Sequence, residues 1–133
     1  MSTTILILDD DPGVLDTLAS VLEDLGHPLI RCSEPRKALE QVWEHRPRVV
    51  ITDLMMPQMN GLEVLRRVKE IDPRIEVVVV TGYGSVKEAV DAIRDGAFDF
   101  ICKPFNAALI EAVVGRALES AKTGGLPPED QSA

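Results

Sequence analysis

The chain has 133 residues, of which 45% are hydrophobic, and this is enough to build one domain around its own core. Its 22 acidic side chains outnumber the 14 basic ones, and the resulting net charge of −8 argues against direct binding to nucleic acid or to an anionic membrane. The sequence has no apolar run long enough for a membrane span and no signal-peptide pattern, so we expect a cytoplasmic protein. The two cysteines, Cys32 and Cys102, lack the spacing of a zinc site or a redox pair and are expected to be small buried hydrophobes.

The first predicted strand, residues 4–9, ends in consecutive carboxylates. Its run of isoleucine and leucine has no polar interruption, which is typical of a strand buried on both faces. Asp9, Asp10 and Asp11 stand at its carboxyl end. Adjacent negative charges repel one another, and an isolated acidic cluster usually faces water. Asp11 precedes Pro12, a pair that favours the start of a helix, and we therefore assign Asp11 to capping the first helix.

The second and third strands are predicted over residues 28–32 and 48–52. The second has the weaker pattern, PLIRC, and is followed by Pro35, which can start a helix. The third strand leads directly into Asp53. The helix after it has apolar residues at helical spacing and ends at Pro73, because proline cannot continue a helix.

The last two strands are predicted over residues 75–80 and 97–102. A hydroxyl residue, Thr81, follows the fourth strand, and Ser85 has the sequence context of an N-cap for the fourth helix. A fifth helix is predicted over residues 106–121. Strands and helices therefore alternate along the whole chain, which predicts an α/β fold in which a doubly wound parallel sheet of five strands has helices on both faces.

Polar side chains stand at the carboxyl ends of these strands, where parallel sheets bind their ligands. They are Asp9, Asp10, Asp53, Thr81 and Lys103. Uncompensated carboxylates repel one another or take up protons, whereas a hard divalent cation such as Mg²⁺ stabilises them and often binds phosphate oxygens as well. A carboxylate can also be the nucleophile that forms an aspartyl phosphate, with a lysine and a hydroxyl stabilising the phosphoryl oxygens. The residue types therefore indicate a phosphoryl group, with Asp9 and Asp10 assigned to the metal and Asp53 to the phosphoryl group.

The stretches ILILDDDPG, VVITDLMMPQMNGLEVL and VVVVTGYGSVKEAVDAIRDGAFDFICKPF resemble the receiver domain of two-component response regulators. Within that family they are most similar to receivers of the nitrogen-regulation and nitrogen-fixation type. The resemblance implies a receiver domain over residues 1–121 and a flexible tail or linker over residues 122–133. It also implies the flavodoxin-like strand order 2-1-3-4-5, in which Asp10 and Asp53 are neighbours.

The resemblance also implies the members of the phosphorylation site. Asp53 matches the phosphoacceptor. Asp9 and Asp10 match the acidic pair of the magnesium site. Met55, two residues after the phosphoacceptor, matches the residue whose backbone carbonyl completes the coordination of Mg²⁺.

The same resemblance extends to residues that respond to phosphorylation. Thr81 matches the switch hydroxyl, and Phe100 matches the aromatic switch position. An ordinary role of Phe100 as a core aromatic is an equally good interpretation. Lys103 matches the lysine of the site, and its bond to Pro104 is expected to be cis. Tyr83 is at a position that tunes the lifetime of the phosphoryl group in receivers, with surface packing as the alternative.

The resemblance implies a signalling switch rather than an enzyme with an outside substrate. The chain would accept a phosphoryl group from a sensor histidine kinase or a phosphotransfer protein and lose it by self-catalysed hydrolysis. A shift in the face formed by the fourth helix, fifth strand and fifth helix would control an output such as transcription, through a homodimer or a downstream effector domain. Two alternatives remain: a phosphorylation-independent interaction module with the same fold, and an aspartate-nucleophile phosphatase, for which Asp9 and Asp11 form a DxD pattern.

Overall fold

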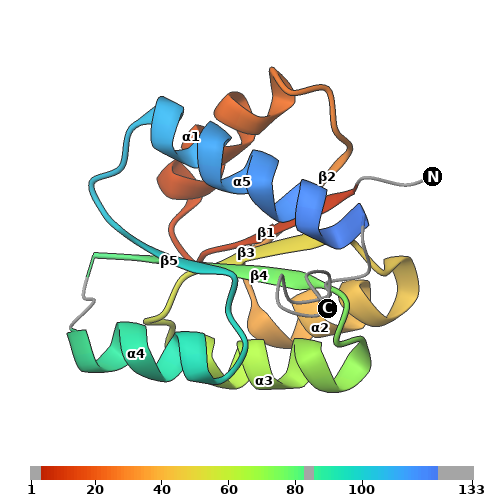
Figure 1. Cartoon of the computed structure of the whole chain (residues 1–133), viewed down its shortest axis with the longest axis vertical. Coiled ribbons are helices and arrows are strands. Elements are labelled where there is room, and N and C mark those ends of the chain that lie inside the picture. Colours follow the sequence, from red (N-terminus) through yellow and green to blue (C-terminus); the bar gives the residue numbers. More distant parts are fainter. Residues whose placement is uncertain (1–3, 83–85, 123–133) are drawn as a thin grey trace, which may run out of the picture.

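A computed structural model describes residues 4–82 and 86–122, which form a five-stranded parallel sheet with helices on both faces (Figure 1). The strands are β1 (Ile5–Leu8), β2 (Leu29–Cys32), β3 (Val49–Thr52), β4 (Glu76–Thr81) and β5 (Asp99–Cys102). The helices are α1 (Pro12–Glu23), α2 (Pro35–His45), α3 (Gly61–Ile71), α4 (Val86–Arg94) and α5 (Ala107–Lys122). The spatial order of the strands is β2-β1-β3-β4-β5, so the predicted doubly wound fold is confirmed.

Strand side chains alternate between two hydrophobic cores, one on each face of the sheet. In β1, Ile5 and Ile7 pack with α1 and α5, whereas Leu6 and Leu8 belong to the core under α2, α3 and α4. Figure 1 shows the same division, with α1 and α5 above the sheet and the other three helices below it. Both faces are covered, which explains why the strands read as continuous apolar runs in the sequence.

Several predicted helix starts are confirmed. The Asp11 carboxylate accepts a hydrogen bond of 2.8 Å from the Gly13 N–H, and Pro12 is the first residue of α1. Pro35 begins α2, and Asn106 caps α5 by accepting a hydrogen bond from the Leu109 N–H. The predicted N-cap Ser85 lies outside the described residues. None of the helices in the described part of the chain is long and apolar enough to cross a membrane.

Two expectations need correction. Cys32 is buried as predicted, but Cys102 is exposed, because it follows the last buried residue of the edge strand β5. The fifth helix extends to Lys122, one residue beyond its predicted end at residue 121. The rest of the predicted tail, residues 123–133, lies outside the described residues.

Asp72 connects the end of α3 to two arginines. Its carboxylate accepts hydrogen bonds from the Arg74 backbone N–H, Nε and Nη2, at 3.0, 3.1 and 3.1 Å, and Arg46 Nη1 lies 3.6 Å away. The hydrogen bonds from Arg74 are the largest cause that holds the pKa of Asp72 below its usual value. This network fixes the loop between α3 and β4 against the end of α2.

Gly61 is packed against the backbone of the residue that follows β3. Its N–H donates a hydrogen bond of 2.7 Å to Leu54 O. A Cβ atom at this position would lie 2.7 Å from Leu54 Cα and would overlap the carbonyl oxygen of Asp53. Since the neighbouring atoms are backbone, they cannot move aside as a flexible side chain can, and only glycine fits without displacing Asp53.

We expect Gly61→Ala to lower the free energy of unfolding by about 2 kcal/mol, because the added methyl group overpacks the loop. Urea denaturation monitored by circular dichroism measures this change. Gly115→Ala is the matched control, since a Cβ there has no neighbour within 4 Å. In the helix interior, that control should gain about 0.5 to 1 kcal/mol. Equal stability of the two variants would contradict the packing argument.

Asp72→Asn should destabilise the protein at neutral pH and much less in acid. The folded pKa of Asp72 is lowered, so its contribution to stability is present above the unfolded pKa and is lost as the pH falls through the folded pKa. Urea unfolding at pH 7 and below pH 3.8, the ordinary value for this group, measures the effect. The difference between wild type and variant should narrow at the lower pH, whereas Asp24→Asn, at an exposed site, should show no such narrowing.

Candidate functional site

The acidic residues at the carboxyl edge of the sheet come together because β1 pairs with β3. Leu8 lies opposite Thr52 in this parallel pair, and the Asp53 N–H donates a hydrogen bond of 3.0 Å to Leu8 O. Asp9 and Asp10 follow β1, so that one carboxylate oxygen from each of them and one from Asp53 all lie within 4.8 Å of one another. Asp9 and Asp53 are buried, and Asp10 is exposed to solvent.

Lys103 reaches this acidic cluster from the end of β5. Its Nζ lies 3.0 Å from Asp9 Oδ2 and 3.6 Å from Asp53 Oδ2. Its backbone N–H donates a hydrogen bond of 2.8 Å to the carbonyl oxygen of Thr81, which is fully buried at the end of β4. The ends of four strands, β1, β3, β4 and β5, therefore contribute to one site.

Burial and charge shift the ionisation of two of these groups. Burial raises the pKa of Asp9, and hydrogen bonds from the Asp11 N–H and from Lys103 oppose this shift only in part. Burial alone would lower the pKa of Lys103, but the hydrogen bond and charge of Asp9, together with Asp53, outweigh it and raise that pKa. Lys103 therefore keeps its positive charge at neutral pH. The cluster has three carboxyl groups, and the Lys103 ammonium contacts two of them, so a bound cation would balance the remaining negative charge.

The hydrogen bonds distinguish the three carboxylates. Asp9 Oδ1 accepts from the Asp11 N–H at 2.9 Å and Asp9 Oδ2 accepts from Lys103, so both of its oxygens are engaged. Asp53 Oδ1 accepts a hydrogen bond of 2.8 Å from the Leu54 N–H, while its Oδ2 is the oxygen near Lys103. Asp53 is thus held by one oxygen and presents the other beside a positive charge, which suits a carboxylate nucleophile.

The remaining predicted residues lie around this cluster. Met55 is in the loop after β3, and its side chain is exposed. Phe100 is in β5, is partly buried, and packs against the core under α2, α3 and α4. The peptide bond between Lys103 and Pro104 is cis. Tyr83 lies outside the described residues.

Two contacts of Asp53 were not anticipated from the sequence. The Leu54 N–H holds one carboxylate oxygen, and the Thr52 hydroxyl donates a hydrogen bond of 3.0 Å to the Asp53 carbonyl oxygen. A backbone donor such as Leu54 carries no side-chain signal. Thr52 offered a weak signal, because it is a hydroxyl residue next to the predicted phosphoacceptor at the end of an apolar strand.

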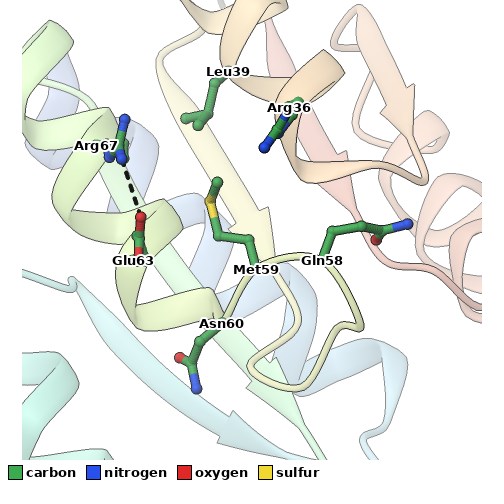
Figure 2. Close-up of a pocket in the computed structure, with 7 residues that line it drawn as sticks. All are labelled: Arg36, Leu39, Gln58, Met59, Asn60, Glu63 and Arg67. Carbon is green, nitrogen blue, oxygen red and sulfur yellow. Dashed lines mark hydrogen bonds and ion pairs between the residues drawn. The ribbon is translucent and has the colours of Figure 1, made fainter.

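A pocket of about 560 Å³ lies between α2, the loop after β3 and α3 (Figure 2). Its lining residues are Arg36, Leu39, Gln58, Met59, Asn60, Glu63 and Arg67. Figure 2 shows Glu63 and Arg67 facing each other on α3, where Arg67 Nη2 lies 3.1 Å from Glu63 Oε2. The acidic cluster is not part of this lining, so this pocket is separate from the candidate site.

Comparison with known proteins finds related sequences over most of the chain. NtrX, a nitrogen assimilation regulatory protein from Azorhizobium caulinodans, is 37% identical over 122 residues, which are 90% of this chain and 27% of that protein. The response regulator protein TodT from Pseudomonas putida is 35% identical over 120 residues, which are 90% of this chain and 53% of TodT. The chain thus spans about a quarter of NtrX and half of TodT.

Solved structures show the same fold. NtrX from Brucella abortus matches with a TM-score of 0.85 and 37% identity, covering 92% of this chain and 28% of that one. The beryllofluoride-activated NtrC4 receiver domain dimer matches with a TM-score of 0.86 and 31% identity, covering 90% of this chain and 98% of that one. These relatives confirm the predicted similarity to the nitrogen-regulation type. Residues 5–115 match the response regulator receiver domain, and the chain therefore belongs to this family of two-component signalling domains.

Proposed function

We propose that Asp53 accepts a phosphoryl group from a phosphohistidine of a sensor histidine kinase or a phosphotransfer protein, in the cytoplasm. One observation carries this proposal: Lys103 Nζ lies 3.0 Å from Asp9 Oδ2 and 3.6 Å from Asp53 Oδ2, at a cluster of three carboxylates. One oxygen of each of these carboxylates lies within 4.8 Å of the other two. The arrangement combines a nucleophile, a fixed positive charge and the oxygen ligands of a divalent cation.

The residues that would hold Mg²⁺ are Asp9, Asp10, Asp53 and the backbone carbonyl of Met55. The oxygen donors of the cluster fit this ion, because magnesium prefers carboxylate, carbonyl and water oxygens. When bound, Mg²⁺ supplies positive charge that stabilises the phosphoryl oxygens. Asp9 has a further role, since its hydrogen bond to Lys103 holds the ammonium group toward Asp53.

In the transfer step, Asp53 Oδ2 attacks the phosphorus atom of the phosphohistidine. The new P–O bond forms as the P–N bond breaks, and the electron pair of that bond returns to the histidine nitrogen. Lys103 and the Thr81 hydroxyl are assigned to the phosphoryl oxygens. Hydrolysis reverses the modification when water attacks the phosphorus and Asp53 leaves as a carboxylate, and we assign the lifetime of the phosphoryl group in part to Tyr83.

Phosphorylation is proposed to shift the face formed by α4, β5 and α5, with Thr81 and Phe100 as the switch residues. This face has exposed apolar side chains, including Val90 and Ile93 on α4 and Leu109 on α5. Exposed apolar groups of this kind are suited to a protein interface. A homodimer through the face is supported by the NtrC4 relative, whose receiver domain is described as a dimer.

The output that the switch controls is proposed from the relatives, which are longer than the part that matches this chain. Several of them, including the DctD protein of Pseudomonas aeruginosa, are transcriptional regulatory proteins about four times longer than the matched part. We propose that residues 1–121 form the receiver domain, which controls transcription through a downstream effector domain after the segment 122–133. The receiver itself modifies only its own aspartate and has no other substrate.

Incubation with acetyl phosphate and Mg²⁺ should add one phosphoryl group to the natural chain and none to Asp53→Asn, because the variant lacks the nucleophilic carboxylate. Intact-mass spectrometry measures the gain. Chelation of the metal should remove it, since the surplus negative charge of the cluster would then repel the donor. Asp11→Asn is the matched control, because Asp11 caps α1 and is not in the cluster.

A phosphoryl gain on Asp53→Asn, or a gain that does not need Mg²⁺, would contradict the assignment of the site. No gain on the natural chain would favour a phosphorylation-independent interaction module with the same fold. Release of phosphate from a panel of phosphomonoesters, with many turnovers, would favour the aspartate-nucleophile phosphatase instead.

The proposed interface predicts that beryllofluoride, a phosphoryl mimic, doubles the mass measured by light scattering. Ile93→Asp should keep the chain monomeric under the same conditions, because a charge would be buried in the interface. Trp43→Asp is the control, since Trp43 is an exposed apolar residue on α2, outside the proposed face. If the mass stays unchanged with the mimic, the dimer proposal fails while the phosphorylation site stands.

A further inference from the structure

A basic cleft lies at the amino edge of the sheet, the edge opposite the acidic cluster. It has a volume of about 330 Å³ and is formed by the end of α2, the loop into β3 and the loop between α3 and β4. Its lining residues are His45, Arg46, Pro47, Arg48, Asp72, Arg74 and Ile75. Three arginines face one carboxylate in a chain whose net charge is −8, so the local charge is opposite to that of the whole protein.

Two of these arginines are held in fixed positions. Arg46 Nε and Nη1 donate hydrogen bonds of 3.1 Å to the carbonyl oxygens of Trp43 and Ile71, and its guanidinium lies 4.8 Å from the centre of the Trp43 ring. Arg74 is bound to Asp72 through Nε and Nη2. A single carboxylate therefore serves both guanidinium groups, and positive charge remains in excess in a preorganised arrangement.

The backbone of Arg46 has a conformation that arginine seldom adopts. Its φ is +46°, and it is the only residue other than glycine with a positive φ in the described ranges. Glycine or asparagine is the usual residue at such a helix end. The position therefore carries an arginine where its backbone favours glycine, and the contacts of the guanidinium give the physical reason.

The chain leaves α5 beside this cleft. Arg48 Nη1 donates a hydrogen bond of 3.5 Å to the carbonyl oxygen of Ala121, in the last turn of α5. After Lys122 the sequence is TGGLPPEDQSA, which contains Glu129 and Asp130 and no lysine or arginine. Glu129 is seven residues beyond Lys122, and an extended segment of that length reaches about 24 Å, enough to bring its carboxylate back to the cleft.

We propose that the basic cleft is the docking surface for this segment, with the carboxylates of Glu129 and Asp130 paired to Arg46, Arg48 and Arg74. Docking fixes the direction in which the chain leaves α5. It also keeps the segment at the edge of the sheet opposite Asp53, so the phosphorylation site stays open. In a longer protein the same segment joins the receiver to the next domain, and the cleft then orients that connection.

The test uses the full chain at low salt and compares amide chemical shifts by ¹H–¹⁵N NMR. In Glu129→Gln/Asp130→Asn, the backbone amides of the cleft should shift, because two charges leave the cleft; these are the amides of His45, Arg46, Arg48, Asp72, Arg74 and Ile75. The control Glu23→Gln/Asp24→Asn removes an adjacent acidic pair from an exposed site at the end of α1 and should leave those amides in place. High salt should shift the cleft amides of the natural chain toward their positions in the first variant, since it screens ion pairs.

Arg74→Gln probes the cleft from its other side, because the Arg74 side chain is 69% exposed and its replacement should not unfold the chain. It should shift the amides of Glu129 and Asp130. Unchanged cleft amides in the tail variant, or equal shifts in the control, would overturn the proposal. If the tail variant has no effect but an added free peptide of sequence LPPED shifts the cleft amides, the cleft serves an acidic segment of another protein, and the proposal is likewise overturned.

Discussion

The parallel pairing of β1 with β3 is the constraint on which the rest of the site depends. It brings the residues after Leu8 and Thr52 to the same point on the sheet edge, so that Asp9, Asp10 and Asp53 meet there. The register is fixed because side chains of β1 alternate between two cores, and a shift by one residue would exchange every one of them. The fold therefore forces these carboxylates together, and their repulsion is partly offset by the Lys103 ammonium that reaches them from β5.

Backbone groups hold Asp53, the proposed phosphoacceptor, in place. The Leu54 N–H binds one oxygen of Asp53, and Gly61 fills the space against its carbonyl, where any side chain would collide. The other carboxylate oxygen faces Lys103. A carboxylate that is supported on one side and faces a positive charge on the other is suited to a reactive role, because orientation contributes to the rate only when the group cannot turn away.

The two edges of the sheet have opposite electrostatic character. The carboxyl edge carries the acidic cluster, whereas the amino edge carries the arginines around Asp72. Asp72 also has a structural role there, since it binds both Arg46 and Arg74 and so connects the end of α2 with the entry to β4. The edge proposed for phosphorylation and the edge proposed for docking of the following segment are thus separated by the length of the strands.

The alternation of strands and helices could be predicted from the residues alone, because the burial of both sheet faces leaves continuous apolar runs. Local helix starts such as the Asp11 cap could also be predicted in this way. Periodicity could not fix the order of the strands, since any parallel order buries the same runs; the order came from the family resemblance. Three features are visible only in the folded chain: Lys103 bonds Asp9 across 94 positions, Gly61 touches Asp53, and Cys102 is exposed. These features depend on which atoms from distant parts of the chain come within a few ångströms of one another. A sequence pattern contains no information about such distances.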